Sequence, residues 1–104
     1  MRTWELRTED GRLFGFQVDN TYTGRRGVVR TIAKIPGVEI TAGTRYRERR
    51  QDIFCRFTLQ GAPFFAEEPW GDNSRFDIRA ENEAGFAHVS FLKGVFERVW
   101  WMGV

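Results

Sequence analysis

The run from Glu67 to Phe76 reads E-E-P-W-G-D-N-S-R-F and is the most informative stretch of this sequence. It gathers carboxylates, an amide, a hydroxyl and a guanidinium between two strand-like segments, residues 63–66 and the segment that Arg75 opens. Groups of these types could bind an anionic or amide-bearing group of a partner, with Arg75 and Asn73 as donors. No catalytic or ligand motif matches the run, so it predicts a polar site at the end of a sheet without a defined chemistry.

The same run also has the composition of a tight turn, and we favour this interpretation. Residues 72–74 can accept hydrogen bonds from nearby backbone N–H groups, and Gly71 supplies unusual backbone angles. Trp70 would then cap the core. The candidate binding residues of the run and of the C-terminus are Glu68, Trp70, Asp72, Asn73, Arg75 and Trp101.

The carboxylates of the run are a weak argument for catalysis. Neighbours on a strand point to opposite faces, so Glu67 and Glu68 do not flank one substrate atom. Arg75 is expected to pair with one of them across the hairpin, a contact worth under about 1 kcal/mol when exposed. No catalytic residue is therefore predicted, and an enzyme built on this run stays a minor alternative.

The run also carries a resemblance. It resembles a family of small uncharacterised bacterial proteins in which a strand ends in E-P-aromatic-G-D-N-S-R-aromatic. The likeness extends back through the Ile35–Val38 helix exit and covers residues 14–80. The resemblance implies a small α+β fold and no assigned activity. The matching positions are Glu68, Pro69, Trp70, Gly71, Asp72, Asn73, Ser74, Arg75 and Phe76.

A basic region suggests a second function. Residues 20–50 hold eight Arg or Lys against two Glu, whereas the whole chain carries a net charge of +2. Arginines with an interleaved aromatic suit phosphate contact and base stacking. Arg56, Arg79 and Phe54 are expected to extend this region on the outer sheet face. The nucleic-acid alternative rests on Arg26, Arg30, Lys34, Arg45, Tyr46, Arg47 and Arg49, but no binding signature is present and a solvated surface is favoured.

The remaining reactive side chains favour structural roles. Cys55 is the only cysteine, which excludes an internal disulfide and a multi-cysteine metal site. It alternates with apolar residues and is expected in the core. His88, the only histidine, lies on the apolar face of a predicted helix without a nucleophile arrangement around it. No cofactor and no metal are predicted. Trp101 and Phe86 are expected to project from the polar side of that helix, where they suggest self-association.

Composition indicates one domain, residues 1–104, with enough aromatic residues for a core. The chain has ten Phe, four Trp and two Tyr, and 29% of its residues are charged. No window approaches the roughly 18 apolar residues of a membrane span, and residues 1–7 lack the apolar region of a signal peptide. We therefore expect a cytoplasmic protein that does not bind membranes.

Alternating apolar residues predict the strands. They are expected at residues 3–7, 14–18, 38–42, 53–59, 64–68 and 76–80. A helix capped by Asn20 or Thr23 precedes the Pro36–Gly37 stop, and the last twenty residues form an amphipathic helix. In that helix the predicted buried arc includes Phe91.

Each strand has one apolar face, which predicts an α+β two-layer sandwich: a mainly antiparallel sheet of five or six strands with two helices on one face. For function, a small non-enzymatic interaction module that binds protein or itself is favoured, through a sheet face, an edge strand or the C-terminal helix. The biological process, the partner and the oligomeric state do not follow from the sequence.

Overall fold

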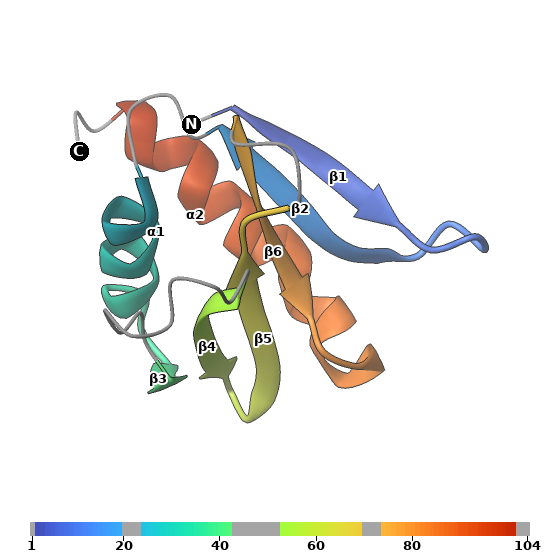
Figure 1. Ribbon diagram of the computed structural model, residues 1–104. Coiled ribbons are helices and arrows are strands. Elements are labelled where there is room, and N and C mark those ends of the chain that lie inside the picture. The colour runs from blue at the N-terminus through green and yellow to red at the C-terminus, as the bar shows by residue number, and fades with distance from the viewer. Residues whose placement is uncertain (1, 20–23, 43–52, 70–73, 102–104) are drawn as a thin grey trace.

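The computed structural model describes residues 2–19, 24–42, 53–69 and 74–101, with the side chains of residues 100 and 101 excepted. Within these ranges the sheet has six strands in the order β1-β2-β6-β5-β4-β3, and all neighbouring strands are antiparallel (Figure 1). The elements in chain order are β1 (Thr3–Arg7), β2 (Leu13–Asp19), α1 (Gly24–Ala33), β3 (Val38–Ala42), β4 (Ile53–Leu59), β5 (Ala62–Glu67), β6 (Arg75–Ala80), a 3-10 helix (Glu83–His88) and α2 (Val89–Trp101).

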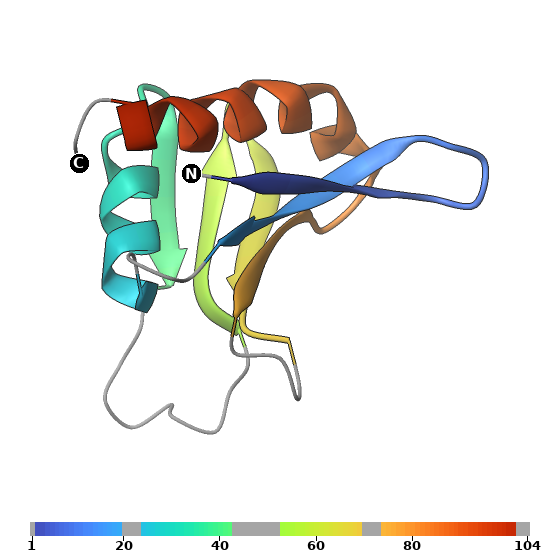
Figure 2. The ribbon, with the colours of Figure 1, turned by 90° about the horizontal axis from the view of Figure 1, so that it is seen from above.

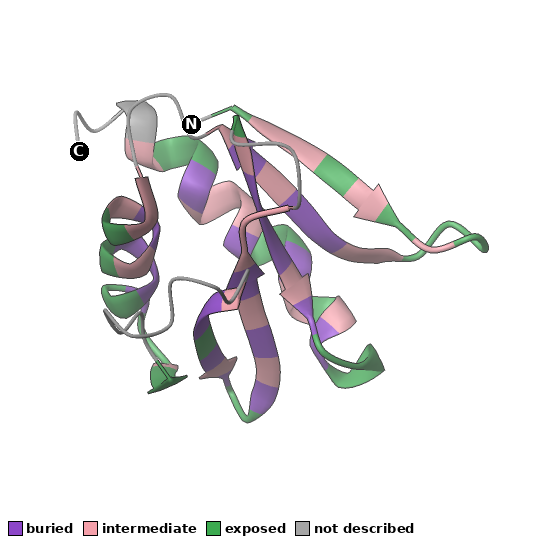
Figure 3. Ribbon diagram, viewed as in Figure 1, coloured by how far each residue is buried: buried purple, intermediate pink, exposed green. Residues whose placement is uncertain are grey.

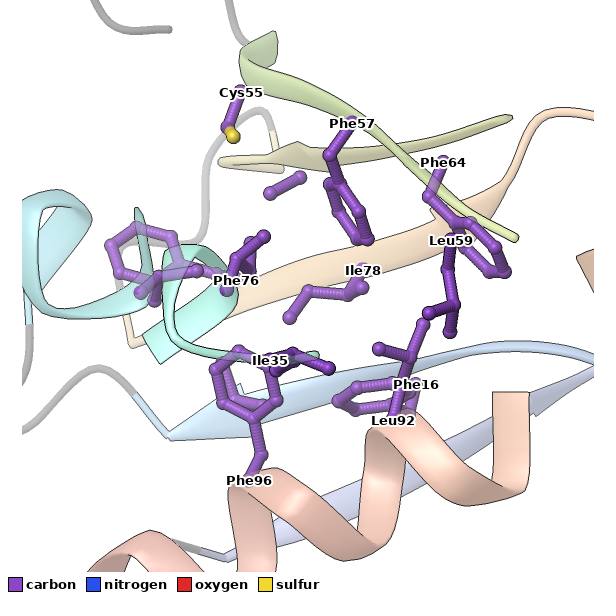
Figure 4. Close-up of a cluster of buried hydrophobic side chains, with 14 of the residues drawn as sticks. Phe16, Ile35, Cys55, Phe57, Leu59, Phe64, Phe76, Ile78, Leu92 and Phe96 are labelled. Atoms are coloured by element: carbon purple, nitrogen blue, oxygen red, sulfur yellow. The ribbon is translucent and has the colours of Figure 1, made fainter. Parts of the chain in front are cut away.

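Both helices lie on the same side of the sheet, and α2 runs across it in the view of Figure 2. One hydrophobic core fills the space between the layers. Val28 and Ile32 of α1 and Leu92 and Phe96 of α2 are fully buried in it. Figure 4 shows that the strands supply most of its rings, including Phe57, whose ring stacks on that of Phe64 at 5.4 Å. The predicted two-layer α+β fold is confirmed.

Side chains alternate between the two faces of the strands, most clearly along β5, where buried and half-buried residues follow one another (Figure 3). A bulge in β4 interrupts this rule at Phe54, because Ile53 pairs with Glu67 and Cys55 with Ala66. Phe54 is consequently buried, with its ring 5.1 Å from that of Phe76. Its predicted place on the outer face is wrong, since a period of two does not hold across a bulge.

The β4–β5 hairpin is tighter than the sequence predicts. Leu59 pairs with Ala62, so Gln60 and Gly61 alone form the turn, with φ values of 51° and 82°. Two consecutive positive φ values define a type I′ turn, whose twist matches that of the strands. The strand expected at residues 64–68 therefore begins earlier, at Ala62.

The predicted helix α1 is confirmed, and its apolar stripe packs on the sheet. Val28, Ile32 and Ile35 are buried. Gly37, in the turn after the helix, has a φ of 86°, a value that favours glycine. The turn after Ala33 is held by the Ile35 N–H, which donates to the Ile32 carbonyl at 3.1 Å. The predicted capping residues, Asn20 and Thr23, lie outside the described residues.

The C-terminal segment departs from the sequence prediction in two ways. It begins as a 3-10 helix, and Phe86 packs there against the core instead of projecting from a polar helix face. In α2 the buried stripe is centred on Val89, Leu92 and Phe96, whereas the Phe91 side chain is 50% exposed. The predicted burial of Phe91 is wrong because it lies roughly opposite this stripe at 3.6 residues per turn.

Candidate interaction face

The side of the sheet away from the helices carries a continuous set of polar and aromatic side chains. We call this surface the open face, because no described residue of α1 or α2 lies on it. Its members come from five strands and the segment after β6, and the ladder brings them side by side. They are Trp4, Phe14, Gln17, Arg56, Phe65, Glu67, Arg75, Asp77, Arg79 and Glu81.

Arg75 packs against an aromatic ring at one end of the open face. Its Cζ atom is 3.5 Å from the centre of the Trp4 ring, and Arg2 approaches the same ring at 5.2 Å. Arg75 also donates a hydrogen bond from Nη1 to Oε1 of Gln17, at 3.2 Å. The expected pairing of Arg75 with Glu67 or Glu68 is therefore wrong: stacking on β1 holds it, and β1 is remote in sequence.

Gln17 links this arginine to a buried carboxylate. The Gln17 Nε2 group donates to Oδ1 of Asp77 at 2.8 Å, and Asp77 is only 8% exposed. Trp4, Gln17 and Asp77 are direct cross-strand partners. The amide thus receives a hydrogen bond from Arg75 and gives one to Asp77, which fixes all three groups in one arrangement.

Arg79 occupies the middle of the open face. Its guanidinium carbon lies 5.1 Å from the Phe14 ring and 5.7 Å from the Phe65 ring, while Nη1 pairs with Oε1 of Glu67 at 3.1 Å. Gly15 makes room for this side chain, because a Cβ atom there would lie 3.0 Å from Arg79 Cγ and 2.7 Å from a backbone oxygen. The buried Nε group of Arg79 has no hydrogen-bond partner among the described residues.

Positive and negative groups alternate across the open face. Arg56 pairs with Glu81 and also lies 6.0 Å above the Phe65 ring. Arg79 pairs with Glu67 in the same way. The arginines are therefore balanced by carboxylates, so that the open face offers planar, rigid groups without a strong field of one sign.

A hollow lies where the open face meets the 3-10 helix. It has a volume of about 320 Å³, and its walls include the rings of Phe14 and Phe86 with the side chains of Arg79 and Glu81. The Arg12 guanidinium covers the Phe86 ring at 5.3 Å and pairs with Glu83 at 3.0 Å. The hollow can receive a side chain of a partner that lies across the sheet.

Comparison with known proteins does not indicate a function for the open face. No protein family, no curated protein and no solved structure matches the chain. The inference of function therefore rests on the geometry alone.

The described residues of the 67–76 run face different sides of the sheet. The predicted opposite orientation of its two carboxylates is confirmed: Glu67 lies on the open face, whereas Glu68 pairs with Arg25 of α1 at 3.3 Å. Arg25 in turn covers the Phe54 ring at 5.2 Å. The other candidates, Trp70, Asp72, Asn73 and the Trp101 side chain, lie outside the described residues.

The described residues of the predicted basic surface lie on both sides of the sheet. Arg26 and Arg30 are exposed on α1 and Lys34 is exposed just after it. Arg56 and Arg79 lie on the open face, on the other side of the sheet, and each is paired with a glutamate. The remaining candidates, Arg45, Tyr46, Arg47 and Arg49, lie outside the described residues.

Other reactive groups are consistent with structural roles. Cys55 is buried, and loss of hydration raises the pKa of its thiol to about 11. His88 is half-buried at the end of the 3-10 helix. Among the described residues there is no group of three His, Cys, Asp or Glu that could hold a metal ion. No helix in the described ranges has the length and apolarity that a membrane crossing needs.

Most of the open face is not recognisable in the sequence. Trp4 lies in the strand expected at residues 3–7, and no site motif includes Gln17, Phe65 or Asp77. For Gln17, Phe65 and Asp77 the sequence signal is position, since they occupy the alternate sites of strands whose other side chains are mostly apolar. Trp4 gives the opposite signal: it is one of the apolar residues of β1, yet its pairing with Gln17 places it on the open face. The pairing of β2 with β6, 60 residues apart for Gln17 and Asp77, is what assembles them.

Proposed function

We propose that this protein is a small, non-enzymatic, cytoplasmic module that binds another protein through the open face. The observation that carries the proposal is the series of arginines held on aromatic rings, with Arg75 on Trp4 and Arg79 between Phe14 and Phe65. Tryptophan and arginine are the side chains most enriched at the energetic centres of protein interfaces.

The rigidity of these groups supports the proposal. An interface side chain that is already immobilised loses little rotamer entropy on binding. Immobilising a mobile side chain costs about 0.5–1.5 kcal/mol of binding free energy. Gln17 and Trp4 hold the Arg75 guanidinium, while Glu67 holds that of Arg79. The open face therefore presents its planar groups already in place.

The charge balance of the open face indicates the kind of partner. Its arginines alternate with Glu67, Asp77 and Glu81, so a polyanion gains little net attraction there. A protein surface of mixed charge, with one apolar side chain for the hollow beside Phe14, is complementary to it. We therefore expect binding that changes little with salt, in contrast with phosphate-driven binding.

The test uses the whole chain and two matched double variants. One replaces Phe65 and Arg75 by Ser on the open face, and the other replaces Arg26 and Arg30 by Ser on α1. Tagged proteins are incubated with a nuclease-treated lysate of the cells that make the protein, and captured proteins are quantified by mass spectrometry. We expect the same partner with the wild type and the α1 variant at 50 and 300 mM salt, and its loss with the open-face variant.

Folding of each variant is checked first by circular dichroism and thermal unfolding. If the open-face variant folds and still captures the partner, the open face is not the binding surface. Loss of capture with the α1 variant alone would assign binding to the helix side.

A second function, nucleic-acid binding, is supported by one observation. Arg26, Arg30 and Lys34 are exposed, and no ion pair is found for them within the described part of the chain. Fluorescence anisotropy with labelled single-stranded RNA and DNA at 20 mM salt tests this. If these residues bind phosphates, Arg26→Ser with Arg30→Ser lowers the salt slope by roughly one unit per lost contact. No binding by the intact protein would remove this alternative.

A further inference from the structure

The outer surface of α2 contains two adjacent features that the fold itself does not explain. Phe91 is 50% exposed, the most exposed of the large apolar side chains in the described ranges. One turn later, Gly94 lies in the middle of the helix. Both point away from the buried stripe of Val89, Leu92 and Phe96, at 3.6 residues per turn.

Within the described residues, no contact requires a glycine at position 94. Of these residues, a Cβ atom built there would meet only the flexible end of Arg98, at 3.7 Å, which is ordinary van der Waals contact. Its φ is not in the positive range that favours glycine, and glycine is less favourable than alanine in a helix interior. A glycine on an outer helix face permits another molecule to approach the backbone closely.

We infer that the outer surface of α2 binds the same surface of a second copy of this chain, with Phe91 of each copy over Gly94 of the other. A projecting ring and an adjacent gap on one patch are self-complementary, as a two-fold symmetric interface requires. Phe91 and Gly94 are three residues apart, which is a common spacing of helix positions that interlock with the side chains of a facing helix.

Charge determines the relative direction of the two helices. Arg98 lies on the same surface as Phe91 and Gly94, and no ion pair is found for it in the described ranges. Parallel helices would bring the two Arg98 side chains together. Antiparallel helices that cross between residues 91 and 94 separate them by about 16 Å along the axis, beyond the ~8–10 Å screening length. The antiparallel arrangement also places Arg98 over Ala87, which is small and exposed.

This pairing is independent of the proposed function, because α2 and the open face lie on opposite sides of the sheet. The dimer would present two open faces on its outer sides. A partner with two epitopes could engage both, which raises the apparent affinity without any new contact.

Sedimentation velocity of the full chain from 5 µM to 1 mM tests the inference. We expect a monomer–dimer equilibrium that Phe91→Glu abolishes and that Arg30→Ala, an exposed substitution on α1, leaves unchanged. Gly94→Ala is the decisive variant: it should raise the thermal midpoint of the monomer and weaken the dimer at least tenfold. A chain that stays monomeric at 1 mM overturns the inference, and so does a dimer that Gly94→Ala leaves intact.

Cross-linking tests the antiparallel arrangement separately. Cys55 is buried and its thiol pKa is raised to about 11, so introduced surface cysteines are the reactive ones. Mild oxidation of an equimolar mixture of Ala87→Cys and Arg98→Cys chains should give a disulfide-linked heterodimer. Ala87→Cys alone should give none. Self-linking of Ala87→Cys, or an unlinked mixture, contradicts the arrangement, while the protein-capture experiment with the open-face variant remains unaffected by this outcome.

Discussion

On the open face, the residue type tolerated at one position depends on the space and hydrogen bonds that its cross-strand neighbours require. Gly15 shows this most directly, because the Arg79 side chain crosses its position to reach Phe14. Asp77 is another case, since its burial is tolerated only with the Gln17 amide as hydrogen-bond donor. At this scale, one added methyl or one lost donor should have a measurable effect.

Gly15→Ala and Gly94→Ala add the same methyl group with opposite expected results. At Gly15 the new Cβ lies 2.7 Å from the Ile78 carbonyl oxygen, so we expect a loss of about 1–3 kcal/mol in the free energy of unfolding. At Gly94 the new Cβ makes only an ordinary contact with the flexible end of Arg98, at 3.7 Å, so we expect a gain of about 0.5–1 kcal/mol. Urea unfolding at 2 µM protein measures both. Equal effects at the two positions would show that the close approach at Gly15 is absent.

Cys55 should make stability depend on alkaline pH. Its thiol titrates near 9.0 when unfolded, and burial raises this pKa to about 11 in the folded protein. The folded state therefore keeps a proton that the unfolded state releases. The contribution of this proton to the free energy of unfolding is fully present below about pH 8.5. Roughly 1 kcal/mol of it is lost by pH 10, and the loss is complete above pH 11.

The measurement compares urea unfolding of the wild type and of Cys55→Ala at pH 8 and pH 10. We expect the stability difference between the two proteins to fall by about 1 kcal/mol at the higher pH. An unchanged difference, or rapid reaction of the folded protein with a thiol reagent at pH 8, would contradict the burial of Cys55.

At the scale of elements, turns and bulges decide which side chains reach which face. The Gln60–Gly61 turn joins β4 to β5 with no spare residue, and this sets the register that puts Phe65 on the open face and Phe57 in the core. The bulge at Phe54 moves one ring from one face to the other. Local chain geometry thus controls the composition of both faces.

Gln60 has a φ of 51°, an unusual value for a residue with a side chain. Asparagine adopts this conformation more readily and is preferred before glycine in type I′ turns. Gln60→Asn should therefore raise the free energy of unfolding by a few tenths of a kcal/mol, up to about 1 kcal/mol. Thermal and urea unfolding check this, with Thr58→Asn on β4 as a control that should not stabilise. Destabilisation by Gln60→Asn would argue against the type I′ turn.

At the scale of the whole molecule, the sheet separates stability from recognition. The helix side buries the rings of Phe16, Phe57, Phe64 and Phe76, whereas the open face carries rings that lie under arginines. Substitutions on the two sides should therefore differ in kind. Truncation of the buried rings that face the helices should destabilise the protein strongly, and truncation of the rings on the open face should leave it folded.

Phe57→Ala and Phe65→Ala form a matched pair on neighbouring strands. Phe57 is 1% exposed and Phe65 half-buried, so we expect the first to cost about 3–5 kcal/mol and the second under half of that. Urea unfolding of both variants gives the comparison. A loss below about 1 kcal/mol for Phe57→Ala would show that the two faces of β4 are assigned the wrong way round.

Much of the fold follows from the sequence because local patterns specify it. Alternation at Cys55, Phe57 and Leu59 and the Pro36–Gly37 stop depend on neighbours a few residues away, and the structure confirms the strand and the helix exit. Ile53 is the exception, because the bulge pairs it with Glu67 and takes it out of the core. The two-layer arrangement follows as well, since most strands have an apolar face that the helices cover. In β1 the apolar Trp4 and Leu6 lie instead on the open face, opposite Gln17 and Gly15.

The candidate face did not follow from the sequence, because it depends on pairings between distant segments. Trp4 and Arg75 meet only because β1 pairs with β2 and β2 with β6. Polar side chains carry no long-range pattern that specifies such a partner, and two arginines of similar context, Arg75 and Arg79, receive different neighbours from the register. Tertiary structure therefore decided which residues form the open face, because cross-strand register, and not composition, sets which side chains touch.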